Sequence, residues 1–250
     1  MNYSMKKLIL IKLGGSIISD KTKINKARFN VIKDLSRQVK EILENDKNLS
    51  IIITTGAGGF GHPVAKIYEH NLEEGLPFIK DAVKAINQIV IESLNKEGVR
   101  AVSVEPSEIA QYKNKEIVSL FHGFIVGLLE KNIIPVFHAD LVDDQKLGIS
   151  ILSMDKFLVD LAIFFKNKNY EVEKVIFAGT TAGVVSRVGT TIKKITKKNL
   201  SKIKEVFYKG KGIDVTGGMK YKVEQCLRLA EEEIDSYITN DLSKKGTQIE

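Results

Sequence analysis

Cysteine is almost absent from this chain of 250 residues, and tryptophan is absent altogether. The single thiol, Cys226, excludes an intrachain disulfide framework and a cysteine-based zinc cluster. With four prolines and 19 glycines, the chain has too little of either for a fibrous or low-complexity protein. The composition of 43% hydrophobic and 28% charged residues is that of a globular protein that buries a core without cross-links.

Long hydrophobic runs are also lacking. No stretch approaches the ~20 apolar residues that a transmembrane helix needs, and Lys12 interrupts the apolar run at residues 8–13. The first seven residues are too short and too polar for the start of a signal peptide. We therefore expect a cytoplasmic protein without a membrane partner.

Acidic residues are fewer than basic ones: the chain has 31 Asp and Glu and 38 Lys and Arg, which gives a formal net charge of +7. The excess is regional, since residues 187–222 hold eleven Lys and Arg against two acids. Such a segment forms either a solvated lysine-rich face or a lobe that holds a polyphosphate. We expect no nucleic-acid partner, because only Phe207, Tyr208 and Tyr221 are available there to stack on bases.

Short β-branched runs alternate with segments of helical periodicity, which is the pattern of an α/β protein. The predicted strands are residues 7–13, 51–55, 99–104, 133–138, 172–178 and 234–239, with a short apolar run at 149–152. The predicted helices are residues 31–44, 78–95, 116–131 and 196–207. Two more are expected: one with Ser153 as its N-cap, and one that begins at residues 217–218. We infer a sheet with helices on both faces and no internal repeat.

Three of these strands end on glycine-bearing loops, at residues 14–16, 56–62 and 179–183. Open α/β sheets bind ligands at the carboxyl ends of their strands, and glycine lets backbone amides approach phosphate oxygens. The P-loop pattern G-x-x-x-x-G-K-S/T, the H-R-D and D-F-G signatures of protein kinases and a full G-x-G-x-x-G are all missing. The loops therefore indicate a phosphate ligand on a different fold.

Three lysines accompany the glycine loops. Lys12 lies in an apolar strand, where its charge needs a partner unless the side chain reaches solvent at the strand edge. Lys21 follows on the connecting loop, and Lys222 lies one turn into the helix that opens at residues 217–218. Lysines together with backbone amides can position a moving phosphoryl group and neutralise its charge.

Two further side chains are candidates for this chemistry. Asp155 starts a helix, where a carboxylate complements the helix dipole, and it could also pair with Lys12 and Lys222. His62 ends the second glycine loop. It is either a structural or exposed histidine or a hydrogen-bond donor to the phosphate of an acceptor substrate.

Taken together, these segments resemble the amino acid kinase superfamily, and within it the isopentenyl phosphate kinases. The resemblance spans nearly the whole chain in the right order. It is carried by residues 11–16 with Asp20-Lys21, and by residues 56–66, 151–155, 179–184 and 214–224. It implies a homodimeric three-layer α/β/α sandwich with an open, mainly parallel sheet. Residues 1–150 would bind the acceptor and form the dimer, and residues 151–250 would bind the nucleotide.

The resemblance also implies an activity: transfer of the γ-phosphate of ATP, with Mg²⁺, to isopentenyl phosphate, which gives isopentenyl diphosphate for isoprenoid biosynthesis. By position, the catalytic residues would be Lys12, Lys21, His62, Asp155 and Lys222. The residues that bind ATP would be Lys12, Gly14, Gly15, Ser16, Gly58, Asp155, Thr180, Gly218 and Lys222. The acceptor would contact Ala57, Gly58, Gly61, His62 and Met154, and no protein residue is assigned to a metal.

Two alternatives stay open at this point. One is a kinase of the same fold that acts on another phosphate or phosphonate, such as fosfomycin, UMP or another alkyl phosphate. The other is a sensor that binds a nucleotide or ligand without catalysis. The joint presence of four site residues speaks against the sensor, namely Lys12, Lys21, Asp155 and Lys222.

We predict that His62→Ala separates acceptor use from nucleotide binding. A phosphate monoester is mostly dianionic near pH 7, so His62 should position the acceptor rather than remove a proton from it. Loss of one hydrogen bond to a charged group should lower kcat/KM for the acceptor by about 10- to 100-fold. Initial rates with varied acceptor, and titration of a non-hydrolysable ATP analogue, measure the two effects. His70→Ala is the control, and equal loss of both functions in His62→Ala would contradict the role.

Overall fold

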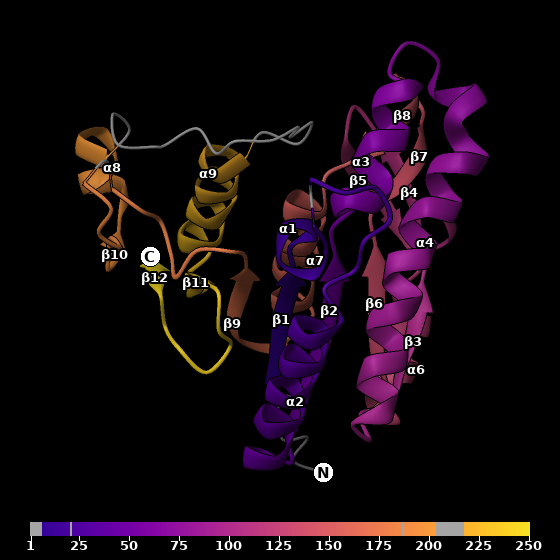
Figure 1. Cartoon of the computed structure of the whole chain (residues 1–250). Coiled ribbons are helices and arrows are strands. Elements are labelled where there is room, and N and C mark those ends of the chain that lie inside the picture. Colours follow the sequence, from indigo (N-terminus) through magenta and orange to yellow (C-terminus); the bar gives the residue numbers. More distant parts are fainter. Residues whose placement is uncertain (1–6, 21, 187, 204–217) are drawn as a thin grey trace.

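A computed structural model describes residues 7–20, 22–186, 188–203 and 218–250, with only the backbone for residues 201–203. Its centre is an eight-stranded sheet in the order β10-β12-β11-β9-β1-β2-β6-β3 (Figure 1). These strands are β1 (Lys7–Leu13), β2 (Leu49–Thr55), β3 (Ala101–Val104), β6 (Ile134–His138), β9 (Glu171–Ala178), β10 (Lys194–Ile195), β11 (Ser236–Thr239) and β12 (Thr247–Ile249). All pairings from β3 through to β11 are parallel, whereas β11 and β12 pair antiparallel.

A second, four-stranded sheet lies beside the first, in the order β5-β4-β7-β8. It comprises β4 (Ala110–Lys113), β5 (Glu116–Leu120), β7 (Asp140–Asp144) and β8 (Gly148–Leu152). The helices are α1 (Gly15–Ile18), α2 (Phe29–Asn45), α3 (Gly58–Ile67), α4 (Leu72–Lys96), α5 (Pro106–Ile109), α6 (His122–Glu130), α7 (Met154–Lys166), α8 (Lys197–Ile203) and α9 (Gly218–Glu231). Within the described residues, no helix combines the length and the apolar composition needed to cross a membrane.

Strand β1 shows how the layers form. Its side chains alternate between two core clusters, so that Leu8 and Leu10 pack in one and Ile9 and Ile11 in the other. The first cluster contains the inner faces of α6, α7 and α9, and the second those of α2 and α4. Burial on both faces is expected for a parallel strand covered by helices on each side. The predicted three-layer α/β/α arrangement is confirmed.

Helix α7 follows directly from local sequence signals. The Ser153 side chain accepts a hydrogen bond from the amide of Lys156, and Asp155 lies in the first turn, where a carboxylate favours the helix dipole. Apolar residues recur every three or four positions, and Phe157, Leu158 and Leu161 are fully buried. Position 155 is thereby fixed at the start of α7, directly after β8 of the four-stranded sheet ends.

Most of the predicted elements are confirmed, including the strands at residues 7–13, 51–55, 133–138 and 172–178 and the helices at 31–44 and 78–95. The strand predicted at 99–104 is β3, an edge strand with Val102 36% exposed rather than fully buried. The strand predicted at 234–239 is β11, and a further strand that was not predicted, β12, follows it. Of the helix predicted at 196–207, the first part is α8, and residues 204–207 lie outside the described residues.

The prediction of one helix over residues 116–131 is wrong in its first part. Residues Glu116–Leu120 form β5, which pairs antiparallel with β4, and helix α6 begins only at His122. Asn114 and Lys115 between the strands have φ angles of 53° and 64°. Two consecutive residues in the left-handed region are typical of a two-residue hairpin turn. The turn therefore commits the following β-branched residues to a strand.

The carboxylate of Asp144 ties this hairpin to the turn between β7 and β8. It accepts hydrogen bonds from the amides of Asn114 (2.7 Å), Lys115 (2.6 Å), Lys146 (2.9 Å) and Leu147 (3.1 Å). The residue is 1% exposed, and burial alone would raise its pKa. The hydrogen bonds outweigh this effect and hold the pKa of Asp144 at about 2.

We predict that Asp144→Ala lowers the urea midpoint of unfolding, because it leaves up to four backbone amides without their acceptor. The pKa is lowered on folding, so the contribution is fully present above the ordinary pKa of 3.8 and is lost as the pH falls towards 2. The difference between wild type and variant should therefore shrink below pH 4. Asp143→Ala, at an exposed neighbouring position, is the control. Equal midpoints for the two variants would contradict this role of Asp144.

Candidate active site

The three glycine loops predicted from the sequence lie side by side. They follow β9, β1 and β2, which are consecutive and parallel in the sheet, so their carboxyl ends share one edge. The backbones of two loops touch, because a Cβ placed on Gly15 would lie 2.2 Å from the amide nitrogen of Gly58. Gly58 also has a φ of 53°, a left-handed conformation that glycine adopts without strain. Side chains at these positions would drive the loops apart.

The amides at this edge are not all equivalent. The amide of Gly14 donates to the carbonyl of Ala178 at 2.9 Å and so joins β1 to β9. Gly15 and Ser16 form the first turn of α1, where backbone amides have no partner inside the helix. Gly15 and Ser16, rather than Gly14, therefore present the amides best suited to an anion.

Two lysines and one aspartate from three elements meet at the same edge. The Nζ atoms of Lys12 on β1 and Lys222 on α9 each lie 2.8 Å from Oδ1 of Asp155 on α7. Alternation along β1 directs Lys12 to the face with Leu8 and Leu10, which is the face that α7 and α9 cover. The predicted contact of Asp155 with both lysines is confirmed by these distances.

The cluster carries a net positive charge in a largely buried place. Asp155 is 4% exposed, and burial by itself would raise its pKa. The charges and hydrogen bonds of Lys12 and Lys222 outweigh the burial and hold the pKa of Asp155 well below its ordinary range. Two ammonium groups and one carboxylate leave one positive charge, which suits the binding of an anion.

Phe177 is a contributor that sequence reasoning missed. The Nζ atom of Lys222 lies 5.4 Å from the centroid of its ring, a cation–π contact. Phe177 is on β9 and pairs in register with Lys12 on β1. The residue lies in an ordinary apolar run, so only the strand register reveals its position beside the two lysines.

His62 lies on α3, the helix that begins at the contact between Gly58 and Gly15. It is the fifth residue of the helix and is half-buried. The preceding residue, Gly61, packs tightly on α4, because a Cβ there would lie 2.6 Å from Cγ1 of Val83 and 2.8 Å from Cβ of Ala57. The loop after β2 and the start of α3 are thus held between the Gly15 loop and α4. His62 lies one helical turn beyond the contact between Gly58 and Gly15.

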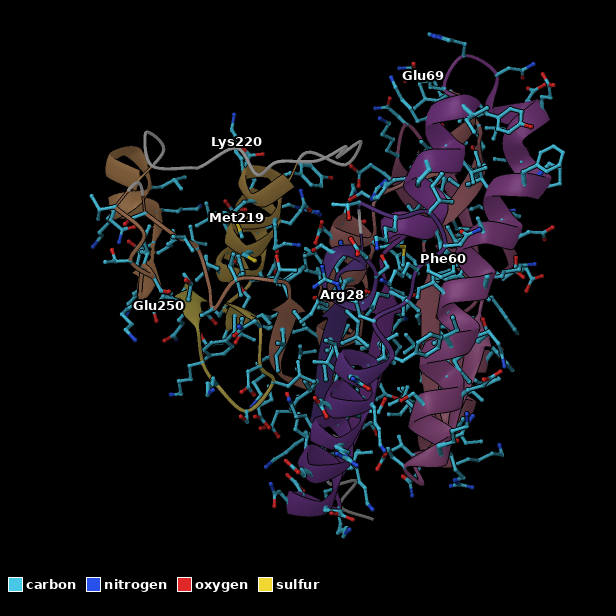
Figure 2. All side chains as sticks on the ribbon, in the orientation of Figure 1. Arg28, Phe60, Glu69, Met219, Lys220 and Glu250 are labelled. Atoms are coloured by element: carbon cyan, nitrogen blue, oxygen red, sulfur yellow. The ribbon has the colours of Figure 1, made fainter. Side chains whose placement is uncertain are left out.

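The remaining predicted residues lie in different settings. The side chain of Met154 packs in the core and is 3% exposed, whereas Thr180 is exposed on the loop after β9. Gly218 begins α9 with a φ of 64°, and Lys21 lies outside the described residues. In Figure 2, Met219 and Lys220 mark the first turn of α9 and Phe60 marks α3, on either side of β1. Among the residues with described positions, no group of three or more His, Cys, Asp or Glu could hold a metal ion.

Comparison with known proteins places these features in a family. The model of the amino acid kinase family matches residues 7–240. An isopentenyl phosphate kinase from Methanocaldococcus jannaschii is 34% identical over 230 residues, which cover 87% of this chain and 85% of the relative. An isopentenyl phosphate kinase from Methanothermobacter thermautotrophicus is 29% identical, with 93% of this chain and 91% of the relative covered.

Solved structures show the same likeness. A crystal structure of an isopentenyl phosphate kinase aligns with a TM-score of 0.70 at 25% identity and covers 97% of this chain and all of that one. The product complex of the isopentenyl phosphate kinase from T. acidophilum gives a TM-score of 0.75 at 19% identity, with 98% of this chain and all of that one covered. At that identity the second likeness shows the fold alone.

We predict that Asp155→Asn destabilises the protein by about 3–5 kcal/mol, because it leaves one buried and one partly buried ammonium group without their counter-charge. The pKa of Asp155 is lowered on folding, so this contribution persists at every pH above the ordinary aspartate range. It is lost only as the pH falls below about 4. Urea unfolding of both proteins between pH 8 and pH 4 measures the effect.

A second substitution tests the cause. Adding Lys222→Met to Asp155→Asn should restore part of the lost stability, because only one buried ammonium group then remains. Asp160→Asn, on the same helix, also loses two cationic partners, Lys156 and Arg228, and is the control. Adding Lys222→Met to Asp160→Asn should restore nothing. Failure of the first pair to recover stability would contradict the account of Asp155 as the shared counter-charge.

Proposed function

The chain belongs to the amino acid kinase family, and on that premise we propose that it transfers the γ-phosphate of ATP to isopentenyl phosphate, producing isopentenyl diphosphate. The observation that carries the proposal is the Lys12–Asp155–Lys222 cluster at the sheet edge where three glycine loops meet. The isopentenyl phosphate kinases among its relatives supply the substrate, and with it a place in isoprenoid biosynthesis. A non-catalytic sensor is not favoured, because Lys12, Lys21, Asp155 and Lys222 are present together and the relatives are kinases.

The reaction is a direct in-line transfer. An oxygen of the acceptor phosphate attacks the γ-phosphorus, a new P–O bond forms, and the bond from that phosphorus to the β–γ bridging oxygen breaks, so ADP leaves. The acceptor is already mostly dianionic near pH 7, so no general base is needed. The ammonium groups of Lys12 and Lys222 bind the ATP phosphates and offset the charge that shifts towards ADP. Asp155 stays ionised and holds both lysines in place.

The other site residues divide between the two substrates. Gly15, Ser16 and Gly58 offer backbone contacts to the ATP phosphates, and Lys21 stabilises the phosphoryl group in transfer. Thr180 and Gly218 face the nucleotide. The acceptor phosphate is bound by His62 and the start of α3, with Ala57, Gly61 and Met154 around it. In this division residues 1–150 hold the acceptor and residues 151–250 hold the nucleotide, and the continuous sheet through β1 and β9 joins the two parts.

Magnesium is proposed to arrive on the nucleotide. The described residues offer no cluster of carboxylates for it, and the Asp155 carboxylate is already paired with two ammonium groups. Mg²⁺ is commonly bound by the phosphates of a substrate with few protein ligands, where it reduces their negative charge.

We also propose that the protein works as a cytoplasmic homodimer. The side chains of Val118, Phe121 and Phe124, on β5 and at the start of α6, are 51%, 69% and 47% exposed. Apolar surface of this kind is suited to cover by a second copy of the chain.

The test is ADP release from ATP and Mg²⁺ with a panel of acceptors: isopentenyl phosphate, dimethylallyl phosphate, fosfomycin, UMP and acetylglutamate. We expect turnover confined to the two alkyl phosphates. Lys222→Ala should lower kcat by about 100-fold, because one charge on the moving phosphates is no longer offset. Lys220→Ala is the matched control, since that lysine is on the same helix with its side chain 65% exposed.

The outcomes separate the alternatives. Turnover with fosfomycin or UMP alone would keep the fold and the lysine roles and overturn the isoprenoid substrate. No turnover with any acceptor, while ATP still binds, would overturn the isoprenoid substrate in favour of an acceptor outside the panel or a sensor.

A further inference from the structure

A buried hydroxyl lies between two of the glycine loops and is not part of the site described so far. Ser19, the residue after α1, is 0% exposed. Its Oγ donates to the carbonyl of Gly15 at 2.6 Å and accepts from the amide of Gly59 at 2.8 Å. One side chain therefore bonds to the loop after β1 and to the start of α3, which follows the loop after β2.

The backbone is tightly packed around these two hydrogen bonds of Ser19, which together form a bridge between the loops. A Cβ on Gly58 would lie 2.1 Å from Oγ of Ser19, and a Cβ on Gly59 would lie 2.5 Å from the carbonyl oxygen of Asp20. The carbonyl of Gly59 accepts from the amide of Asn25 at 3.1 Å. Both backbone groups of Gly59 are therefore bonded to the segment that follows α1.

The bridge uses the donor and the acceptor capacity of one hydroxyl together. An alanine in this place could make neither bond, and a cysteine would make both weakly. Apart from Ser19, the two loops are joined through backbone: the amide of Gly56 donates to the carbonyl of Leu13 at 2.9 Å, and Gly15 touches Gly58. The hydroxyl is the side-chain link that sets how far the Gly15 loop stands from the start of α3.

We propose that Ser19 is a positioning residue that sets the distance between the loop holding the phosphates of ATP and the loop holding the acceptor phosphate. The inference depends on the proposed function for the assignment of the two loops. In-line transfer needs the reacting oxygen and phosphorus about 3–3.5 Å apart. The two substrates are held by loops on different strands, so their separation depends on the contact between those loops.

The first experiment compares Ser19→Ala with the wild type for kcat at saturating substrates and for the two binary dissociation constants. These are for a magnesium-bound, non-hydrolysable ATP analogue and for isopentenyl phosphate, each by calorimetry. We expect kcat to fall by about 10- to 100-fold, because misplacement by ~1 Å costs this much in a reaction between bound groups. Each dissociation constant should stay within threefold of the wild-type value, because each loop still binds its own substrate.

Ser36→Ala is the matched control. Ser36 is 2% exposed and its Oγ also bridges two elements, contacting the carbonyl of Ile32 at 2.9 Å and Oγ of Ser93 at 2.9 Å. It lies between α2 and α4, outside the two loops. Both variants should lose stability, and only Ser19→Ala should lose kcat when the folded fraction is held equal. Equal kcat in the two variants would overturn the proposal.

Two further measurements keep the test decisive. Ser19→Thr retains the hydroxyl and should recover most of the kcat that Ser19→Ala loses. If the folded Ser19→Thr variant has the same kcat as Ser19→Ala, the positioning role is overturned. Amide hydrogen exchange at residues 60–62, which are not assigned to ATP, gives a readout independent of transfer. Adding the ATP analogue should slow this exchange in the wild type and in Ser36→Ala but not in Ser19→Ala. Slower exchange in all three proteins would overturn the proposal that Ser19 couples the two loops.

Absence of turnover in the wild type with every acceptor would count against the proposed function. The exchange measurement would then still decide whether Ser19 couples the two loops.

Discussion

One carboxylate oxygen shared by two ammonium groups is the interaction on which the site depends. Lys12 is placed in an apolar strand, where an unpaired charge would be strongly unfavourable. Asp155 supplies the counter-charge at 2.8 Å, and Lys222 reaches the same oxygen from a third element. β1, α7 and α9 are therefore held together by charge as well as by their apolar packing, at the edge of the sheet where the loops meet.

The lysine cluster and the glycine loops approach the same edge of the sheet from two directions. The lysine cluster lies on the face of the sheet covered by α7 and α9, whereas the amides of α1 and the start of α3 lie at its edge. Glycine allows the backbones at Gly15 and Gly58 to touch, which brings the edge of one loop against the other. In the proposed reaction, a phosphate chain and an acceptor phosphate would lie next to each other at this contact, without a P-loop.

Parts of this arrangement could be predicted from the sequence, and others could not. Short β-branched runs identified β1, β2 and β9, and their glycine loops marked the edge of the sheet where the candidate site lies. The hairpin of β4 and β5 was missed, because two residues in the left-handed region, Asn114 and Lys115, override the apparent helical periodicity after them. Ser19 and Phe177 were missed as well, since nothing in their local sequence distinguishes them from ordinary core residues.

The sequence by itself determined the α/β class, the glycine loops at the strand ends, the charged residues near them and the resemblance to a kinase family, because these features are local patterns. Only the tertiary structure decided which residues touch. Lys12 meets Asp155 across 143 positions of the chain because α7 packs on the face of β1 to which Lys12 points. Phe177 stands beside Lys12 because β9 pairs with β1 in that register. Such contacts depend on strand order and helix packing, which no local pattern specifies.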